Sequence, residues 1–202
     1  MIKFMCRLIE TIQILDGRPE NLFWHNLRLN DTRQKLFGSQ EHIQLEDVIR
    51  IPAEFENSEI KCRISYGREI ERIEFEPYIF RKVNSLKIVY DDTITYSHKY
   101  SDRSQIAELF TQRGEYDDIL IVKNEIITDS SFSNVVLSDG IGLFTPLNPL
   151  LHGTKRAKYI SEGLIRQKDI QPKDLHRYKE IHLINAFLDL GRCVISVGNI
   201  YD

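Results

Sequence analysis

The stretch from residue 95 to residue 137, TYSHKYSDRSQIAELFTQRGEYDDILIVKNEIITDSSFSNVVL, constrains the fold of this chain more than any other. A polar segment that contains Lys99 comes first. Residues 104–112 then place apolar side chains at helical spacing and stop just before Gly114, which predicts a helix. Residues 118–122 and 126–128 are apolar runs around a tight turn and predict a β-hairpin. We expect this order of elements to bring Lys99 and Asp129 into the same region.

Lys99 and Asp129 are residue types with a known joint chemistry. A lysine amine whose pKa is depressed by desolvation or by a nearby cation forms a Schiff base with a carbonyl group. A carboxylate nearby would pair with the protonated ring nitrogen of a pyridoxal cofactor and let the ring accept electrons. Taken alone, most lysines and aspartates are solvated surface groups. The interpretation as a pyridoxal site therefore depends on the order of elements in the whole stretch and not on either residue alone.

The stretch resembles the class IV aminotransferases, which are pyridoxal-phosphate enzymes of fold type IV. Residues 99–103, KYSDR, are similar to the K-x-x-N-R segment of that family's 4-amino-4-deoxychorismate lyases, and residues 128–134, TDSSFSN, are similar to its T-E-G-x-x-x-N turn. Residues 151–156, LHGTKR, resemble its L-x-G-I-T-R phosphate loop, and residues 25–29, HNLRL, resemble its H-x-x-R-L helix. Order and spacing agree over most of residues 8–197.

The resemblance implies an α+β fold of two domains. Residues 1–79 would form a small α+β domain, shortened at its N-terminus relative to the family, and residues 80–202 would form a larger pseudobarrel domain that carries the Schiff-base lysine. Apolar, β-rich runs independently predict strands at 4–15, 60–66, 68–77 and 86–90, and a partly amphipathic pattern that stops at Gly38 predicts a helix over 23–38. Residues 77–85 are the expected domain connection.

The resemblance also assigns roles to individual residues. Lys99 would hold pyridoxal phosphate and move protons, Asp129 would hold the proton on the ring nitrogen, and Arg28 would bind the phosphate. Asp129 stands where the family has glutamate, so its side chain is shorter by one methylene group. The other implied cofactor contacts are Asn134, Gly153, Thr154, Lys155, Asn185 and Ala186.

The residues before a predicted helix at 157–166 support the phosphate assignment without the family. Small residues at a helix N-terminus leave backbone N–H groups free to bind an anion. Gly153, Thr154 and Lys155 occupy such a position, although an ordinary helix start capped by Thr154 explains the same pattern. Arg28 can equally be a surface arginine on its helix, whereas His25 and His182 lie among apolar residues and are expected to be structural.

Three functions stay open. The first is a lyase that eliminates pyruvate from 4-amino-4-deoxychorismate and gives 4-aminobenzoate, a step of folate biosynthesis; residues 99–103 and the Asn185-Ala186-Phe turn favour it. The second is an amino acid aminotransferase of branched-chain or D-amino acid type, although the branched-chain tyrosine five residues after the lysine is Ser104 here. The third is a pyridoxal-phosphate-binding relative without turnover.

Composition and charge limit the partners and the cellular compartment that we expect for this protein. A net charge of −3 without a long basic cluster argues against nucleic acid as a partner. Cys6, Cys62 and Cys193 are an odd, widely spaced set and are expected to be free thiols in a reducing compartment. No apolar run approaches membrane-spanning length, so we expect a cytoplasmic protein. The sequence indicates no metal site. The resemblance implies a homodimer and a small amino substrate that bears a carboxylate.

Overall fold

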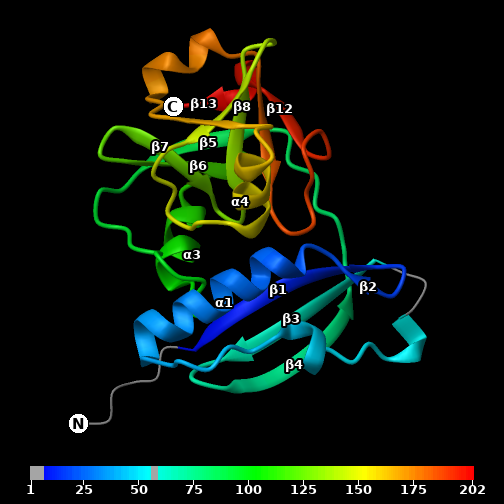
Figure 1. Ribbon diagram of the computed structural model, residues 1–202. Coiled ribbons are helices and arrows are strands. Elements are labelled where there is room, and N and C mark those ends of the chain that lie inside the picture. Colours follow the sequence, from blue (N-terminus) through cyan, green and yellow to red (C-terminus); the bar gives the residue numbers. More distant parts are fainter. Residues whose placement is uncertain (1–6, 56–58) are drawn as a thin grey trace. The chain divides into compact units, whose positions relative to one another are not determined.

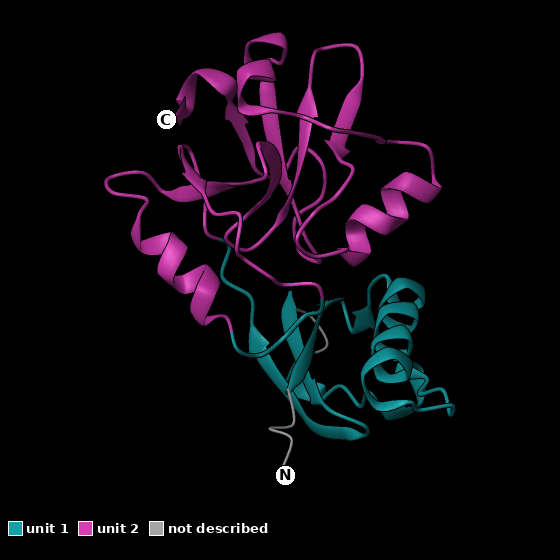
Figure 2. Cartoon of the chain, turned by 90° about the vertical axis from the view of Figure 1, so that its left-hand side faces the viewer, with its two compact units in different colours: residues 1–80, 98–102 teal, residues 81–97, 103–202 magenta. Residues whose placement is uncertain are grey.

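The computed structural model describes residues 7–55 and 59–202, and the chain divides into two compact units. Unit 1 comprises residues 1–80 and 98–102, and unit 2 comprises residues 81–97 and 103–202 (Figure 2). Cys6 and the beginning of the strand predicted from residue 4 lie outside the described residues. Both units combine sheets with helices, which confirms the predicted α+β class.

Unit 1 is a four-stranded antiparallel sheet with helix α1 along one face (Figure 1). The strand order is β2-β1-β3-β4. The bounds of its elements are β1 (Leu8–Leu15), β2 (Arg18–Pro19), α1 (Leu22–Phe37), α2 (Leu45–Val48), the 3-10 turn η1 (Ala53–Phe55), β3 (Ile60–Tyr66) and β4 (Ile70–Pro77). The predicted strands at 60–66 and 68–77 and the predicted helix at 23–38 are therefore present.

One face of this sheet forms the core of unit 1. Alternate residues of β1 and β3 point to the same side and pack with Leu29 of α1; they are Leu8, Ile12, Ile14, Ile60, Cys62, Ile64 and Tyr66. Helix α1 ends at Gly38, whose φ of 68° is left-handed and whose N–H bonds back to Gln34. Helix α1 buries Leu29 together with polar side chains such as His25, whereas Leu27 and Leu36 are exposed.

The segment 98–102 joins unit 1 although the chain has already entered unit 2. The N–H of Ile9 donates to the carbonyl of Lys99 at 2.9 Å, and the N–H of Ser101 donates to the carbonyl of Arg7 at 2.8 Å. Leu8 and Tyr100 form an antiparallel bridge. Lys99 therefore lies beside β1 in unit 1, whereas the family resemblance implies that it belongs to the larger domain over residues 80–202. Pairing between residues about 90 positions apart leaves no local sequence signal.

Unit 2 is built on a nine-stranded mixed sheet (Figure 1). The path β10-β9-β8-β7-β6-β5-β13 is extended by β11, which pairs with β8 and β12. The bounds are β5 (Leu86–Tyr90), α3 (Ser104–Thr111), β6 (Asp118–Lys123), β7 (Ile126–Ser130), β8 (Asn134–Ser138), β9 (Leu143–Pro146), α4 (Thr154–Ser161), β10 (Arg166–Lys168), η2 (Pro172–Arg177), β11 (Glu180–Ile184), β12 (Val194–Ser196), η3 (Val197–Asn199) and β13 (Ile200–Tyr201).

The hairpin predicted after Gly114 is present as β6 and β7. Asn124 and Glu125 at its tip have φ angles of 50° and 63°, as a two-residue hairpin turn with left-handed residues requires. Both strands are almost fully buried, since β6 runs through the middle of the sheet. The main core of unit 2 includes Leu120, Val122, Ile127 and Val135.

Helix α4 differs from its prediction at both ends. We predicted a helix over residues 157–166, but it spans Thr154–Ser161. Gly163, with a φ of 70°, turns the chain out of the helix, and Arg166 already pairs with Phe144 in the sheet. The predicted interval had included this glycine as an ordinary helical residue. The actual start at Thr154 places the whole first turn of α4 directly after Gly153.

Within the residues that the structure describes, no helix is both long and apolar enough to cross a membrane. Cys62 and Cys193 are buried free thiols, as predicted. Over residues 7–55 and 59–202, no cluster of three or more His, Cys, Asp or Glu side chains could hold a metal ion.

Candidate functional site

Arg28 is held by a buried carboxylate on the neighbouring strand. Its Nε donates to Glu10 Oε1 at 2.8 Å and its Nη2 donates to Glu10 Oε2 at 2.5 Å. Glu10 has no exposed side-chain surface, and Arg28 is 15% exposed. Glu10 points to the core face of the sheet because it shares the register of Leu8 and Ile12 on β1. A paired fork of this kind fixes the plane of the guanidinium.

His25 donates to the same carboxylate from one turn earlier in α1. Its Nδ1 lies 2.6 Å from Glu10 Oε2. Burial lowers the pKa of His25, Glu10 opposes that shift, and the positive charges of Arg28 and Lys99 lower the pKa further. His25 is therefore a neutral imidazole with its proton on Nδ1. This confirms the expectation that His25 is a hydrogen-bonded core residue.

Glu10 itself stays ionised. Burial raises the pKa of Glu10, but the charge of Arg28 and the hydrogen bonds from His25 and Arg28 outweigh burial and lower the pKa from 4.5 to about 2. The carboxylate and the guanidinium thus form a buried ion pair at neutral pH. Lys99 is half-buried beside β1, and its charge acts on His25. Unit 1 therefore contains two of the predicted site residues, Arg28 on α1 and Lys99 beside β1.

In unit 2, Asp129 and Asn134 face each other across the turn between β7 and β8. They are paired in register, and Asn134 Nδ2 donates to Asp129 Oδ1. The backbone N–H of Leu150 donates to Asp129 Oδ2, and Asn134 Nδ2 also donates to the carbonyl of Leu151 at 2.8 Å. Asp129 and Asn134 are 5% and 6% exposed. The segment before α4 is thereby tied to the β7–β8 turn.

The environment of Asp129 disfavours its charge. Burial raises the pKa of Asp129 from 3.8 to about 7, although the hydrogen bonds from Leu150 and Asn134 pull in the other direction. The charge of Arg156 also lowers this pKa, but less. A cationic ring placed against this carboxylate would favour its ionised form. Each carboxylate oxygen has two acceptor sites, so one more donor can be accepted beside those already present.

Gly153 precedes α4 and lies against Asn134. A Cβ atom at Gly153 would stand 2.0 Å from Asn134 Oδ1, so only glycine allows this approach. Gly153 is the residue before the first helical turn, and Thr154 is the first residue of α4 rather than its cap. Thr154 is 4% exposed. The first turn of a helix offers backbone N–H groups that its own carbonyls do not satisfy, which suits an anion.

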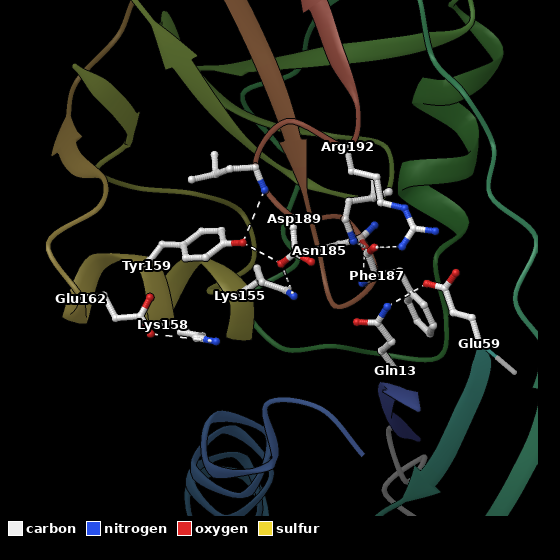
Figure 3. A network of polar contacts seen from close by, with 12 residues as sticks. Gln13, Glu59, Lys155, Lys158, Tyr159, Glu162, Asn185, Phe187, Asp189 and Arg192 are labelled. Carbon is white, nitrogen blue, oxygen red and sulfur yellow. Dashed lines mark hydrogen bonds and ion pairs between the residues drawn. The ribbon is translucent and has the colours of Figure 1, made fainter. Parts of the chain in front are cut away.

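The side chain of Lys155 is committed to another residue. Its Nζ donates to Asp189 Oδ1 at 2.6 Å, and the hydroxyl of Tyr159 donates to the same oxygen at 2.7 Å (Figure 3). Lys155 is buried and Asp189 is mostly exposed. These bonds lower the pKa of Asp189 against the opposing effect of its burial. Lys155 thus links α4 to the loop between β11 and β12, and its backbone is what remains for an anion.

Asn185 and Ala186 begin that loop directly after β11. Asn185 Oδ1 accepts from the backbone N–H of Phe187 at 2.9 Å and of Leu188 at 3.1 Å, so Asn185 closes a tight turn (Figure 3). Arg192 Nη1 donates to the carbonyl of Phe187 at 2.9 Å and fixes the far side of the loop. Ala186, half-buried, lies inside this turn. The side chain of Asn185 is therefore structural.

The predicted residues thus fall into two groups. Unit 1 holds Lys99 and Arg28, and unit 2 holds the remaining set, namely Asp129, Asn134, Gly153, Thr154, Lys155, Asn185 and Ala186. Sequence reasoning assigned no role to Glu10 or Asp189. Glu10 had a detectable signal, because it is a lone carboxylate on the apolar face of an alternating strand. Asp189 is an exposed loop residue without such a signal.

These groups suit the parts of a pyridoxal phosphate molecule. Arg28 carries a fixed pair of charged donors of the kind that suits a phosphate, and the first turn of α4 separately carries backbone N–H groups of the kind that suits an anion. Asp129 is a carboxylate for a protonated ring nitrogen. Lys99 supplies an amine that can bind an aldehyde. The donor set therefore matches this cofactor.

Comparisons with known proteins agree with this chemistry. The pattern of the amino-transferase class IV family matches residues 97–196. An uncharacterized protein from Haemophilus influenzae is 37% identical over 184 residues, which are 90% of this chain and 98% of that protein. The crystal structure of a proposed 4-amino-4-deoxychorismate lyase from Haemophilus somnus is 32% identical, with a TM-score of 0.85, and the match covers 93% of this chain and all of that one.

More distant structures share the fold. A proposed amino-acid aminotransferase from Mesorhizobium loti is 21% identical with a TM-score of 0.78, and the match covers 94% of this chain and 97% of that one. The Haemophilus somnus relative is above 30% identity over its whole length, which is enough to fix the family. This chain therefore belongs to the class IV aminotransferase family of pyridoxal-phosphate-dependent enzymes of fold type IV.

Proposed function

We propose that the protein is a lyase that converts 4-amino-4-deoxychorismate into 4-aminobenzoate and pyruvate. The observation that carries this proposal is the similarity over its full length to the Haemophilus somnus structure, which is itself a proposed lyase of this kind. The KYSDR segment at residues 99–103 and the Asn185-Ala186-Phe turn support the same choice. In the cell this reaction would belong to folate biosynthesis.

The reaction needs a proton acceptor and an electron sink. A proton leaves the ring carbon that bears the amino group, the neighbouring ring carbon loses its bond to the enolpyruvyl oxygen, and the ring becomes aromatic. The departing enolpyruvate takes up a proton at its methylene carbon and becomes pyruvate. Bound pyridoxal phosphate supplies the electron sink. Lys99 Nζ would hold the cofactor and then take the proton from the amine-bearing carbon. Asp129 would hold the proton on the ring nitrogen.

The phosphate would be held by groups from several elements. Arg28 would contribute a charged donor pair, and the residues at the start of α4, Gly153, Thr154 and Lys155, would contribute backbone N–H groups. The Asn185–Ala186 turn would add further backbone contacts, while Asn134 would hold Asp129 in place.

Two measurements test the cofactor assignment. Purified protein reconstituted with pyridoxal phosphate should be yellow, and reduction with borohydride should fix the cofactor mass on the peptide that contains Lys99. Lys99→Ala should lose both the colour and the fixed mass, whereas Lys123→Ala, a control lysine outside the proposed site, should keep them. Modification of a different lysine in the wild type would refute the role of Lys99.

Product analysis tests the reaction. Incubation of the reconstituted protein with 4-amino-4-deoxychorismate should release 4-aminobenzoate and pyruvate in equal amounts. An aminotransferase would instead turn the bound cofactor into its pyridoxamine form with an amino acid and would need an oxo-acid to return. Stoichiometric pyridoxamine formation without 4-aminobenzoate would replace the lyase by this alternative.

Assembly and location also belong to the proposal. A homodimer is typical of this family, and a small amino substrate with a carboxylate follows from the proposed reaction. We propose a cytoplasmic homodimer on that basis. Sedimentation of the purified protein would test the dimer, for which a mass near twice 23.8 kDa is expected.

A further inference from the structure

Glu10 is a charged residue in the apolar core of unit 1. It extends from the core face of β1, between Leu8 and Ile12, and has no exposed side-chain surface. An ionised carboxylate in such a place carries a large desolvation cost unless it is fully paired. Apolar residues occupy the equivalent positions on either side of it. Such a group needs a reason beyond packing.

Its contacts indicate what that reason is. Glu10 uses both oxygens on the Nε–Nη2 edge of Arg28, at 2.8 and 2.5 Å. His25 donates to Oε2 at 2.6 Å from the same helix and limits rotation of the carboxylate. An unrestrained arginine side chain has many rotamers, and fixing it for a ligand costs conformational entropy. Glu10 removes most of that freedom before any ligand arrives.

We propose that Glu10 is the positioning residue for Arg28, oriented by His25, so that the guanidinium is held in a fixed orientation for the phosphate of the cofactor. This inference rests on the proposed function, because it takes Arg28 as a phosphate ligand. Glu10 does not touch the cofactor. It acts through Arg28 alone.

The proposal and simple electrostatics predict opposite effects of Glu10→Gln on phosphate binding. Glu10 cancels the charge of Arg28, so its long-range effect on a phosphate dianion is repulsive. If charge alone mattered, Glu10→Gln would strengthen phosphate binding. If orientation matters more, Glu10→Gln would weaken it, because the charged fork is replaced by a weaker neutral contact. The two effects can therefore be separated by one substitution.

The experiment compares pyridoxal phosphate with pyridoxal, which lacks only the phosphate. Dissociation constants of both are measured for the full chain by absorbance titration. We expect Glu10→Gln to weaken pyridoxal phosphate binding roughly tenfold and to leave pyridoxal within about twofold, which corresponds to coupling of the usual size between contacting residues. Arg28→Lys should show the same selective loss, and the double variant should lose little more than Arg28→Lys alone.

Asn30→Ala is the matched control on the same helix. Asn30 bonds to the backbone of Ile43 and to Arg33, not to Glu10. It should lower the melting temperature while leaving the ratio of the two dissociation constants unchanged. If Glu10→Gln does not fold, Glu10→Asp keeps the charge but withdraws it by one methylene group, and it should weaken only pyridoxal phosphate.

Each outcome has a distinct meaning. Unchanged or tighter pyridoxal phosphate binding in Glu10→Gln, or in Glu10→Asp where that variant stands in, overturns the inference while the proposed function stands. Equal loss of both ligands also overturns it, since the effect would then be on the fold and not on the phosphate. A wild type that binds neither ligand would overturn the proposed function instead.

Discussion

The backbone of Gly153 passes so close to the side chain of Asn134 that a Cβ atom at residue 153 would lie 2.0 Å from Asn134 Oδ1. Asn134 in turn donates to Asp129 and to the carbonyl of Leu151. One glycine therefore determines whether the turn that carries Asp129 and the segment that leads into α4 can lie side by side.

Gly153→Ala should destabilise unit 2. Asn134 would have to move, and its bonds to Asp129 and Leu151 would be lost in a buried place. We expect a loss of about 1–3 kcal/mol in the free energy of unfolding, the usual range for overpacking, measured by urea denaturation.

A second glycine provides the control for this substitution. At Gly198 an added Cβ would meet only Ser196 Oγ, at 3.7 Å, an ordinary contact. Gly198→Ala should change the free energy of unfolding by less than about 0.5 kcal/mol. Equal effects of the two alanines would show that the approach to Asn134 is not what selects glycine at residue 153.

Asp129 should make the cofactor-free protein less stable as the pH rises. Its pKa is raised from 3.8 in the unfolded chain to about 7 in the fold, so the folded state holds the proton more tightly. The free energy of unfolding is therefore highest below pH 4, and it falls by up to about 4 kcal/mol as the pH rises toward 7. Asp129→Asn carries no titratable group and should lack this decline. Parallel curves of stability against pH for the two proteins would contradict the raised pKa.

Glu10 should act in the opposite direction. Its pKa falls from 4.5 in the unfolded chain to about 2 in the fold, so its contribution is present above pH 4.5 and is lost as the pH falls toward 2. The difference in unfolding free energy between wild type and Glu10→Gln should shrink by about 3 kcal/mol over that interval. Chemical denaturation at several pH values measures it. A difference that stays constant down to pH 2 would show that the ionised carboxylate is not favoured by the fold.

Local patterns correctly predicted α1, α3 and the strands β1 and β3 to β7. The β6–β7 hairpin follows from an apolar run on each side of a two-residue turn, and α1 follows from its periodicity and from Gly38. Both signals are contained in fewer than 20 consecutive residues. The predicted C-terminal end of α4 was wrong because Gly163 was counted as helical, although its left-handed backbone ends the helix.

Distant pairing was beyond such reasoning. Lys99 lies beside β1 because its carbonyl accepts from Ile9 and the N–H of Ser101 donates to Arg7, and no periodicity in residues 95–103 indicates that partner. The ion pair between the Lys155 amine and Asp189 could not be predicted either, because it joins a helix to a loop more than 30 residues later. The chemical type of the site residues could be predicted from sequence, whereas the pairing state of each charge could not.

Lys155 should accordingly contribute little to phosphate binding through its side chain. Its amine lies 2.6 Å from Asp189 Oδ1, which also accepts from Tyr159, so the ammonium charge is already neutralised within unit 2. Lys155→Met keeps the buried aliphatic stem and the backbone N–H, and it should leave the dissociation constant of pyridoxal phosphate within about threefold of wild type, in contrast to Arg28→Lys. Absorbance titration measures both variants. If Lys155→Met instead weakened binding as much as Arg28→Lys, the amine must leave Asp189 for the phosphate, and Asp189→Asn should then tighten binding.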